Sequence, residues 1–339
     1  MILRKAIQKM HSVTKSVEYY VGMMLREDPV RPWSVFRYSI DVAVCHILYG
    51  ASVADYFELH FYEKTHRERK TYFTADQALD FINRVNGLEN NHRFYDKTYM
   101  YRVLEEYTKR ELLFCPPQDY QEFEDFFARH PKAFYKPQNT YCGRGIELWS
   151  TDQSELTELY KRASGQAAIL DEPVIQHPDL AAINPDSINT VKIYTMMIKD
   201  ECHFVSAEFR MGRWGSFVDN IEKGGLAAGV DLKTGAIIGT AYDLRMDPYS
   251  VHPDTGAPIS GYILPNWTEL LRFTEECARA CPIAYVEWDI AIRENDCVLI
   301  EANANARNSE LQMGAFHGRK KQFQELEKLY LESRKDSNE

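Results

Sequence analysis

The sequence predicts an α+β fold, and three observations carry this prediction. The first hundred residues place apolar side chains mainly at helical spacing. From Ala133 onward, short strand-like stretches alternate with glycine-containing loops and single helices. Near the C-terminus, the strand-like stretches Tyr285–Ile292 and Cys297–Asn303 flank a polar triplet that is typical of a hairpin loop. Strands grouped in this way, with helices to one side, indicate an α+β architecture.

The composition is that of an ordinary folded protein. The 339 residues suggest about two domains, and a hydrophobic content of 45% is enough to build sizeable cores. The net charge of -10 opposes contact with nucleic-acid phosphates, so we expect no nucleic-acid partner. The seven cysteines are odd in number and lack a Cys-x-x-Cys spacing, which predicts neither a disulfide framework nor a zinc site.

No stretch of the sequence predicts targeting or membrane insertion. Residues Met1–Lys15 lack the continuous apolar core of a secretory signal. The most apolar early run, Tyr38–Tyr49, is too short to span a bilayer. We therefore expect a cytoplasmic protein without a membrane span, and the sequence leaves its oligomeric state open.

Three helices are predicted before the strand-rich part begins. Thr74 and Gln77 form a capping-box pattern ahead of apolar residues at helical spacing, namely Leu79, Ile82 and Val85. A second helix is expected to begin at Asp96, which places Lys97 in its first turn. A third is expected from Asp119 to Arg129.

The rest of the chain is predicted to form two groups of strands. The first group has a strand at Ala133–Lys136, a loop at Pro137–Gly145, a strand at Ile146–Trp149, a helix from about Asp152 and a strand at Ala168–Ile175. The second group has strands at Ile188–Ile198, Cys202–Phe209, Leu226–Asp231 and Ala236–Tyr242, a helix at Thr268–Ala280, the late hairpin and a terminal helix.

The late hairpin predicts a metal site. A loop at residues 294–296 places Asp289 opposite Glu301, and alternation along the strand puts Asn303 on the same face as Glu301. Two carboxylates and an amide oxygen suit a hard cation, and Mg²⁺ prefers such ligands and usually shares substrate phosphates. The alternative is a surface hairpin whose acidic side chains face water.

Two lysines are candidates for binding phosphate. Lys136 ends a strand before a loop that contains Gly143 and Gly145, and glycines expose backbone N–H groups to anions. Lys97 lies in a first helical turn, where the dipole favours an anion. The alternative for both is a solvent-exposed lysine. Neither a P-loop nor a dinucleotide-binding motif is present in the sequence.

The exit of the strand Ala168–Ile175 is a candidate site for adenosine. Its apolar residues Val174 and Ile175 offer a surface for adenine, with Asp179 placed for the ribose. The alternative is an ordinary strand-to-loop exit.

The order of these pieces resembles one known family. A lysine before a helix, a lysine before a glycine loop, a hinge strand and a late Asp with Glu-x-Asn together resemble the sugar-transfer-associated ATP-grasp family, which is related to glutamate and peptide ligases. The resemblance covers roughly residues 50–312. It rests on the runs Gly50-Ala-Ser-Val-Ala-Asp-Tyr-Phe57, Asp96-Lys97, Lys136-Pro137, Ile175-Gln-His-Pro178, Ser187-Ile-Asn-Thr190, Val218-Asp-Asn220, Lys223-Gly-Gly225 and Glu301-Ala-Asn303.

The resemblance implies an ATP sandwiched between two α+β subdomains. The expected division is a helical region at 1–112, a small lid subdomain at 113–175, a large subdomain with the metal site at 176–332 and a polar tail at 333–339. By position, Lys97 and Lys136 would hold phosphates, and Asp289, Glu301 and Asn303 would hold Mg²⁺. The implied adenosine contacts are Glu172, Val174, Ile175 and Asp179, with Gly143 and Gly145 in the phosphate loop.

The sequence departs from the family pattern at three places. Tyr141 and Cys142 stand in the loop where relatives carry more glycine, and Lys192 stands where an arginine is usual. Glu301-Ala-Asn303 is followed by Ala304, Asn305 and Ala306 instead of a proline turn.

The family chemistry implies an ADP-forming ligase that joins a carboxylate, through an acyl phosphate, to an amine, such as an amino acid and a sugar acid. In that scheme Lys192 offsets the remaining negative charge of the phosphates. Arg210 and Arg213 are candidates to clamp the acyl phosphate, and the alternative is that they balance nearby acidic side chains. The remaining candidate substrate contacts are Asn189, Asn220, Lys223, Gly224 and Gly225. The alternatives are a kinase that phosphorylates a small-molecule hydroxyl or amide and a nucleotide-binding module without turnover.

Overall fold

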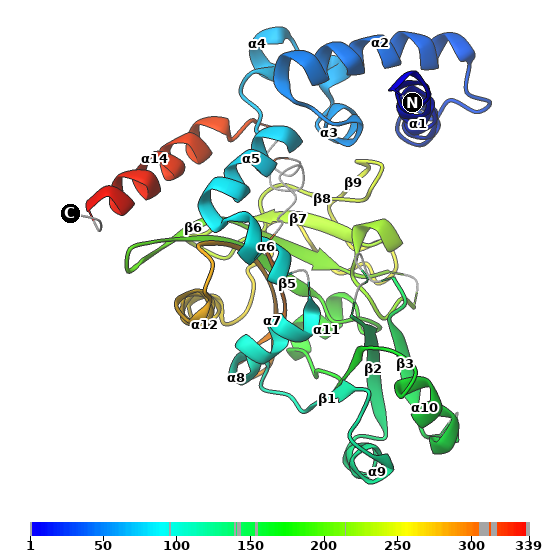
Figure 1. The fold of residues 1–339 in the computed structure, drawn as a ribbon, viewed down its shortest axis with the longest axis vertical. Helices are drawn as coiled ribbons and strands as arrows, with labels where there is room; N and C mark the ends of the chain where they lie inside the picture. The colour runs from blue at the N-terminus through cyan, green and yellow to red at the C-terminus, as the bar shows by residue number, and fades with distance from the viewer. Residues whose placement is uncertain are drawn as a thin grey trace.

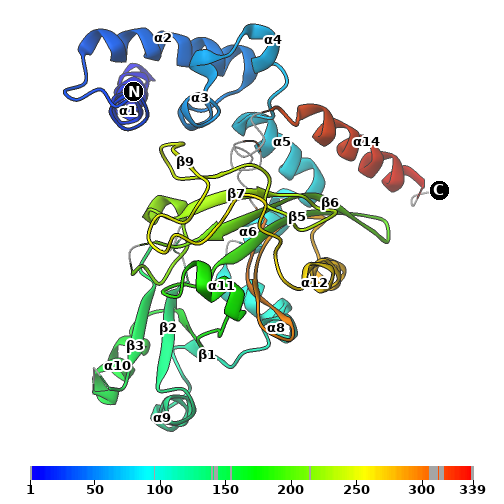
Figure 2. The same cartoon turned by 180° about the vertical axis from the view of Figure 1, so that it is seen from behind.

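The computed structural model describes residues 2–94, 96–138, 140, 144–152, 155–213, 215–304, 312 and 317–336, with only the backbone for residues 2–11 and 336. Two antiparallel sheets and their helices confirm the α+β prediction. In Figures 1 and 2, the first four helices lie at one end of the molecule and the four-stranded sheet lies at the other. The seven-stranded sheet lies between these two parts.

The N-terminal part is helical, as predicted. Thr74 precedes the helix α5, but its hydroxyl and the Gln77 amide both donate to the Tyr49 carbonyl oxygen, at 2.5 and 2.9 Å, so the predicted capping box is absent. Leu79 is 51% exposed, so it lies off the buried face of α5. The helices are α1 (Ile2–Met24), α2 (Pro32–Tyr49), α3 (Val53–Glu58), η1 (Phe61–Glu63), α4 (His66–Arg69), α5 (Ala75–Asn86), α6 (Leu88–Phe94), α7 (Lys97–Val103) and α8 (Glu105–Thr108).

The smaller sheet has the strand order β1-β4-β2-β3. Phenylalanines of α9 and apolar residues of α10 pack in one core with its strands. The strand β4 ends at Asp171, earlier than predicted, because Pro173 has no N–H to continue the ladder. The elements are β1 (Leu112–Cys115), α9 (Tyr120–Arg129), β2 (Lys132–Pro137), β3 (Glu147–Ser150), α10 (Leu156–Ala163) and β4 (Ala168–Asp171).

The larger sheet has the order β11-β10-β5-β6-β7-β8-β9. Helix α12 packs with this sheet in one hydrophobic core. Helices α5 and α14 pack with it in a second hydrophobic core. The predicted strand Ala236–Tyr242 is interrupted: Ile237 pairs with Val230 in an isolated antiparallel bridge, and only Ala241 and Tyr242 form a regular strand. The elements are α11 (Pro178–Ile183), β5 (Thr190–Ile198), β6 (Glu201–Met211), η2 (Ile221–Lys223), β7 (Leu226–Val230), β8 (Ala241–Tyr242), β9 (Pro248–Tyr249), α12 (Trp267–Ala280), β10 (Tyr285–Ile292), β11 (Cys297–Asn303) and α14 (Lys320–Asp336).

The bounds of the late hairpin and the predicted pairing of Asp289 are confirmed, although a β-bulge between Asp289 and Ile290 shifts the register of the pairs nearer the loop by one residue. Asp289 pairs with Glu301, and Glu287 pairs with Asn303. On its other edge β10 pairs with β5, which sets Lys192 beside Asp289. The hairpin therefore lies within the sheet and is not the isolated surface ribbon of the alternative interpretation. Within the described part of the chain, no helix is long and apolar enough to cross a bilayer.

Candidate active site

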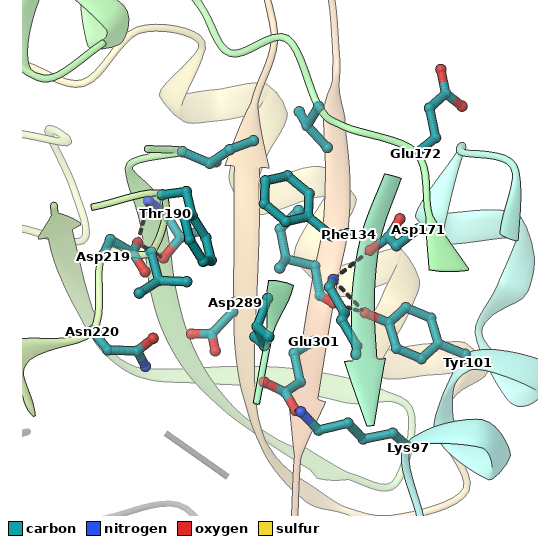
Figure 3. Close-up of a pocket in the computed structure, with 17 residues that line it drawn as sticks. Lys97, Tyr101, Phe134, Asp171, Glu172, Thr190, Asp219, Asn220, Asp289 and Glu301 are labelled. Carbon is teal, nitrogen blue, oxygen red and sulfur yellow. Dashed lines mark hydrogen bonds and ion pairs between the residues drawn. The ribbon is translucent and has the colours of Figure 1, made fainter. Parts of the chain in front are cut away.

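A pocket lies between the two sheets (Figure 3). It holds about 860 Å³ of empty space, part of which is open to solvent. The smaller sheet contributes side chains from β2 and the end of β4, and the larger sheet contributes β5, β10 and β11. Seven of the residues that the sequence singled out line this pocket: Lys97, Lys136, Glu172, Val174, Asn220, Asp289 and Glu301.

One side of the pocket is built around Lys136. Its ammonium contacts the Asp171 carboxylate and donates to the Tyr101 hydroxyl at 3.1 Å. Arg110 donates to the same carboxylate from Nε at 2.7 Å and from Nη2 at 3.1 Å. Burial lowers the pKa of Lys136, but the Asp171 carboxylate more than offsets this, so the pKa is raised. Burial likewise opposes ionisation of Asp171, yet the two cations hold its pKa below the ordinary value.

The other side of the pocket is acidic. Lys192 contacts the carboxylate of Glu287, and its Nζ lies 3.4 Å from Asp289 Oδ1. Lys97 Nζ lies 3.3 Å from Glu301 Oε1. Asn303 contacts this group through Glu287, with 3.5 Å between Nδ2 and Oε1. The predicted metal ligands therefore share the ribbon β10–β11 with a third carboxylate.

Asp289 shows that the ribbon has an excess of negative charge. Burial raises its pKa, Lys192 lowers it, and Glu287 and Glu301 raise it again, giving a pKa of about 7. Its Oδ1 accepts no hydrogen bond from the described residues. A buried carboxylate oxygen that accepts no hydrogen bond is a suitable ligand for a divalent cation.

The protein ligands by themselves do not complete a metal site. Among the residues that the structure describes, no group of three His, Cys, Asp or Glu side chains is arranged to hold an ion. Mg²⁺ keeps several waters and takes further oxygens from substrate phosphates, so these would have to complete its coordination.

The predicted adenosine residues separate in the structure. Val174 lines the pocket, whereas Ile175 is 84% exposed, because successive side chains of an extended segment point to opposite sides. Asp179 lies in the first turn of α11, where its backbone N–H donates to His177 Nδ1 at 3.1 Å. Glu172 accepts from the Glu111 N–H at 3.0 Å, and its carboxylate points away from the other labelled side chains in Figure 3.

The glycine loop is described only in part. Gly145, with φ near 71°, does not line the pocket. Gly143, together with Tyr141 and Cys142, lies outside the described residues.

The two candidate arginines lie off the pocket. Arg210 is 5% exposed and has its Nε 2.5 Å from Glu208 Oε1. Arg213 has its Nη2 3.5 Å from Asp254 Oδ1. Lys192, the third candidate, is turned toward β10, as described above.

Several predicted substrate contacts have structural roles instead. Asn189 is fully buried, and its amide donates to the carbonyls of Leu180 and Asn184 at 2.9 and 3.0 Å, which holds the loop before β5 against α11. Lys223, Gly224 and Gly225 form a turn whose backbone N–H groups bond to carbonyl oxygens within the turn. The Asn220 carbonyl oxygen accepts from the N–H groups of Lys223 at 2.9 Å and Gly225 at 3.1 Å. The Gly224 N–H donates to the Ile221 carbonyl oxygen at 3.0 Å.

Sequence reasoning missed Glu287 and Asp219 as site residues. Glu287 precedes Asp289 by two positions, so strand alternation placed both on one face, and this signal was sufficient to find it. Asp219 lines the pocket and accepts from Thr190 N and Oγ1 at 2.9 and 2.6 Å. Asp219 stands in the run Val218-Asp-Asn220 that carries the family resemblance, and this run was a signal that could have found it.

The two sheets with a pocket between them define an ATP-grasp fold. The chain belongs to the family described as sugar-transfer associated ATP-grasp, which matches residues 76–328. This confirms the resemblance inferred from the sequence.

Solved structures with a similar arrangement are distant in sequence. The chain is similar to the ATP-grasp ligase PsnB complexed with minimal precursor, at 14% identity, covering 78% of this chain and 71% of that one, with a TM-score of 0.45. It is similar to D-alanine–D-alanine ligase from Bacillus anthracis, at 12% identity, coverage of 75% and 72%, and a TM-score of 0.44. A comparison with curated proteins gave no match.

Proposed function

We propose that this protein is an ATP- and Mg²⁺-dependent, ADP-forming ligase that joins a carboxylate to an amine. The observation that carries the proposal is the divided pocket, in which buried cations line one side and a carboxylate ribbon lines the other. Membership of the ATP-grasp family supports ATP as the substrate. We further propose that the reaction takes place in the cytoplasm, where ATP and Mg²⁺ are both present.

We assign the residues by the charge and position of their side chains at the pocket. Lys136 and Lys97 would hold phosphate oxygens, since each is a buried or nearly buried cation at the pocket wall. Val174 and the backbone after β4 would contact adenosine. Asp289, Glu301 and Asn303 would hold Mg²⁺, and Glu287 joins them in this assignment. The small and large subdomains proposed at 113–175 and 176–332 would supply the two walls.

The proposed reaction has two steps. A substrate carboxylate oxygen forms a bond to the γ-phosphorus, and the bond from that phosphorus to the bridging oxygen breaks, which releases ADP and leaves an acyl phosphate. An amine nitrogen then attacks the acyl carbon, loses a proton and displaces phosphate, leaving an amide. Positioning and charge neutralisation account for most catalysis of phosphoryl transfer. When bound, Mg²⁺ supplies positive charge to the phosphate oxygens.

A trapping assay tests this proposal. Purified protein is incubated with ATP, MgCl₂, hydroxylamine and a panel of carboxylic acids, and ADP and hydroxamate are measured together. We expect at least one acid to give both products in equal amounts, because hydroxylamine captures the activated acyl group.

Other outcomes would identify other functions. Phosphate that stays on an acceptor, without hydroxamate, identifies a kinase. A rise in melting temperature with ATP, without ADP formation for any acceptor, identifies a binding module. Neither outcome is compatible with the ligase.

A further inference from the structure

Helix α2 is apolar on two opposite sides, and only one of them is covered. Val42, Cys45 and Tyr49 are buried in a core that α2 shares with α1 and α3. On the other side, apolar residues at helical spacing remain exposed, which we call the α2 stripe. Its members and their exposed fractions are Trp33 (71%), Phe36 (56%), Ile40 (52%), Val44 (42%), Ile47 (80%) and Leu48 (57%).

The α2 stripe lies where a flat surface can reach it. In Figures 1 and 2, α2 runs along the outer edge of the molecule, at the end opposite the small sheet. A soluble helix normally exposes a polar face, and a helix that is apolar all round is normally covered on all sides. An exposed apolar surface of this kind marks an interaction site.

Charge around the α2 stripe points to the nature of the partner. Arg37 is exposed and borders the stripe. The single acid of α2, Asp41, is held by Arg69 at 2.9 and 3.0 Å and by Tyr56 at 2.7 Å. Residues 1–50 contain seven Lys and Arg against four Asp and Glu, a net charge of +3, which leaves -13 for the rest of a chain whose total is -10. The partner should therefore be apolar and anionic.

We propose that the α2 stripe binds the surface of a bilayer containing anionic phospholipid. Trp33, Phe36 and the aliphatic residues enter the boundary between headgroups and acyl chains, and Arg37 stays at the level of the lipid phosphates. The helix lies in the plane of the interface. This inference concerns the N-terminal helices and does not depend on the proposed ligase activity.

A second copy of the chain fits the α2 stripe less well. A two-fold symmetric contact through α2 sets the same stripe against itself, so both copies of Arg37 border the buried surface. Asp41 is already engaged with Arg69 and Tyr56, so α2 supplies no free acid to pair with that arginine. Anionic phospholipid headgroups provide the missing negative charge.

Vesicle co-sedimentation of the full chain tests the proposal. Vesicles of phosphatidylcholine with phosphatidylglycerol are compared with vesicles of pure phosphatidylcholine. We expect binding to the mixed vesicles, weakened about tenfold on pure phosphatidylcholine, and weakened further by salt. Ile40→Glu should weaken binding to the mixed vesicles by about tenfold or more, because it places a charge in the middle of the apolar surface.

A matched control separates this effect from a general effect of added charge. Ile238 is as exposed as Ile40, at 52%, and lies between β7 and β8. Ile238→Glu should bind vesicles as the wild type does, and both variants should keep the wild-type melting temperature. The proposal is overturned if the wild type binds neither kind of vesicle, or if Ile40→Glu binds as well as the wild type. A concentration-dependent dimer that Ile40→Glu dissociates, without vesicle binding, identifies a second copy as the partner instead.

Discussion

The two sides of the pocket differ in how their charges are balanced. On the side of the small sheet, Arg110 and Lys136 surround one carboxylate, Asp171, and both cations are in hydrogen-bonding contact with it. On the side of the ribbon, two lysines face four carboxylates. These are Lys97 and Lys192 against Glu287, Asp289, Glu301 and Asp219.

This difference indicates which ligand each side is suited to. The formal charges of the named groups leave the small-sheet side with one excess positive charge and the ribbon side with two excess negative charges. A network that is already bonded holds Lys136 in place to receive an anion. Burial is the main cause of the raised pKa of Asp289, and the neighbouring carboxylates Glu287 and Glu301 raise it further, against the lowering by Lys192. A phosphate and a divalent ion arriving together would correct both imbalances.

The largest expected effect comes from breaking the ribbon side. Glu301→Ala should reduce ATP-dependent ADP formation by on the order of 100-fold or more, because it removes a charged ligand at the reacting phosphates. The fold should be kept, since Glu301 is half-buried and contacts Lys97 without filling a core position. The steady-state rate of ADP release measures the loss of activity, and the melting temperature measures whether the fold is kept.

A control for this variant lies at the other end of the same hairpin. Glu294 is exposed in the loop between β10 and β11, so Glu294→Ala should keep wild-type ADP formation. Wild-type turnover by Glu301→Ala would contradict the metal assignment. Equal loss in both variants would mean that the hairpin as a whole, and not its carboxylates, matters.

The next largest expected effect is on stability, and it tests the small-sheet side of the pocket, where the charges are paired. Asp171→Asn leaves Arg110 and Lys136 buried without their counter-charge, so the free energy of unfolding should fall by about 3 kcal/mol at neutral pH. Urea unfolding followed by tryptophan fluorescence measures this. Asp152→Asn, an exposed acid beside β3, should stay within about 0.5 kcal/mol of the wild type.

The pH dependence of this loss has a definite sign. The pKa of Asp171 is lowered from its ordinary value of 3.8, so the folded protein holds fewer protons there than the unfolded chain. Ionised Asp171 therefore stabilises the fold above that value, and the stabilisation is lost as pH falls through the lowered pKa. The difference between wild type and Asp171→Asn should narrow in acid. A difference that stays constant with pH would contradict the ion-pair explanation.

Local sequence patterns predicted the ribbon well. The polar loop at residues 294–296 indicated the hairpin, and a β-bulge next to Asp289, which the sequence did not predict, sets Asp289 opposite Glu301. The helix start at Asp96 also agreed, with its carboxylate accepting from the Thr98 N–H at 2.9 Å. Both features depend on residues close together in the chain.

Features that depend on distant segments could not be predicted in this way. Asp171 meets Arg110 from 61 residues away, and no periodicity links them. Thr74 and Gln77 matched a capping box, but the Tyr49 carbonyl competes for their donors. In each case a long-range partner decides the role of the side chain.

The smallest expected effect is a gain in stability, whereas deleting one partner of an ordinary ion pair lowers stability. This difference in sign separates the two sides of the pocket most clearly. Asp289→Asn removes one carboxylate from the ribbon side, where the four named carboxylates outnumber the two lysines. Without metal, at pH 8, it should raise the free energy of unfolding by about 1 kcal/mol, since the ionised form of Asp289 is unfavourable in the folded protein. In contrast, MgCl₂ with ATP should stabilise the wild type and leave the variant unchanged.

Asp296→Asn is the matched control for this variant on the same ribbon. Arg293 holds the pKa of Asp296 below its ordinary value, so this substitution should lower stability slightly and keep the response to MgCl₂ and ATP. Thermal melts of the three proteins, in chelator and in MgCl₂ with ATP, make the test. If Asp289→Asn behaves like Asp296→Asn in chelator, then Lys192 already balances Asp289, and the ribbon has no charge deficit for a cation to fill.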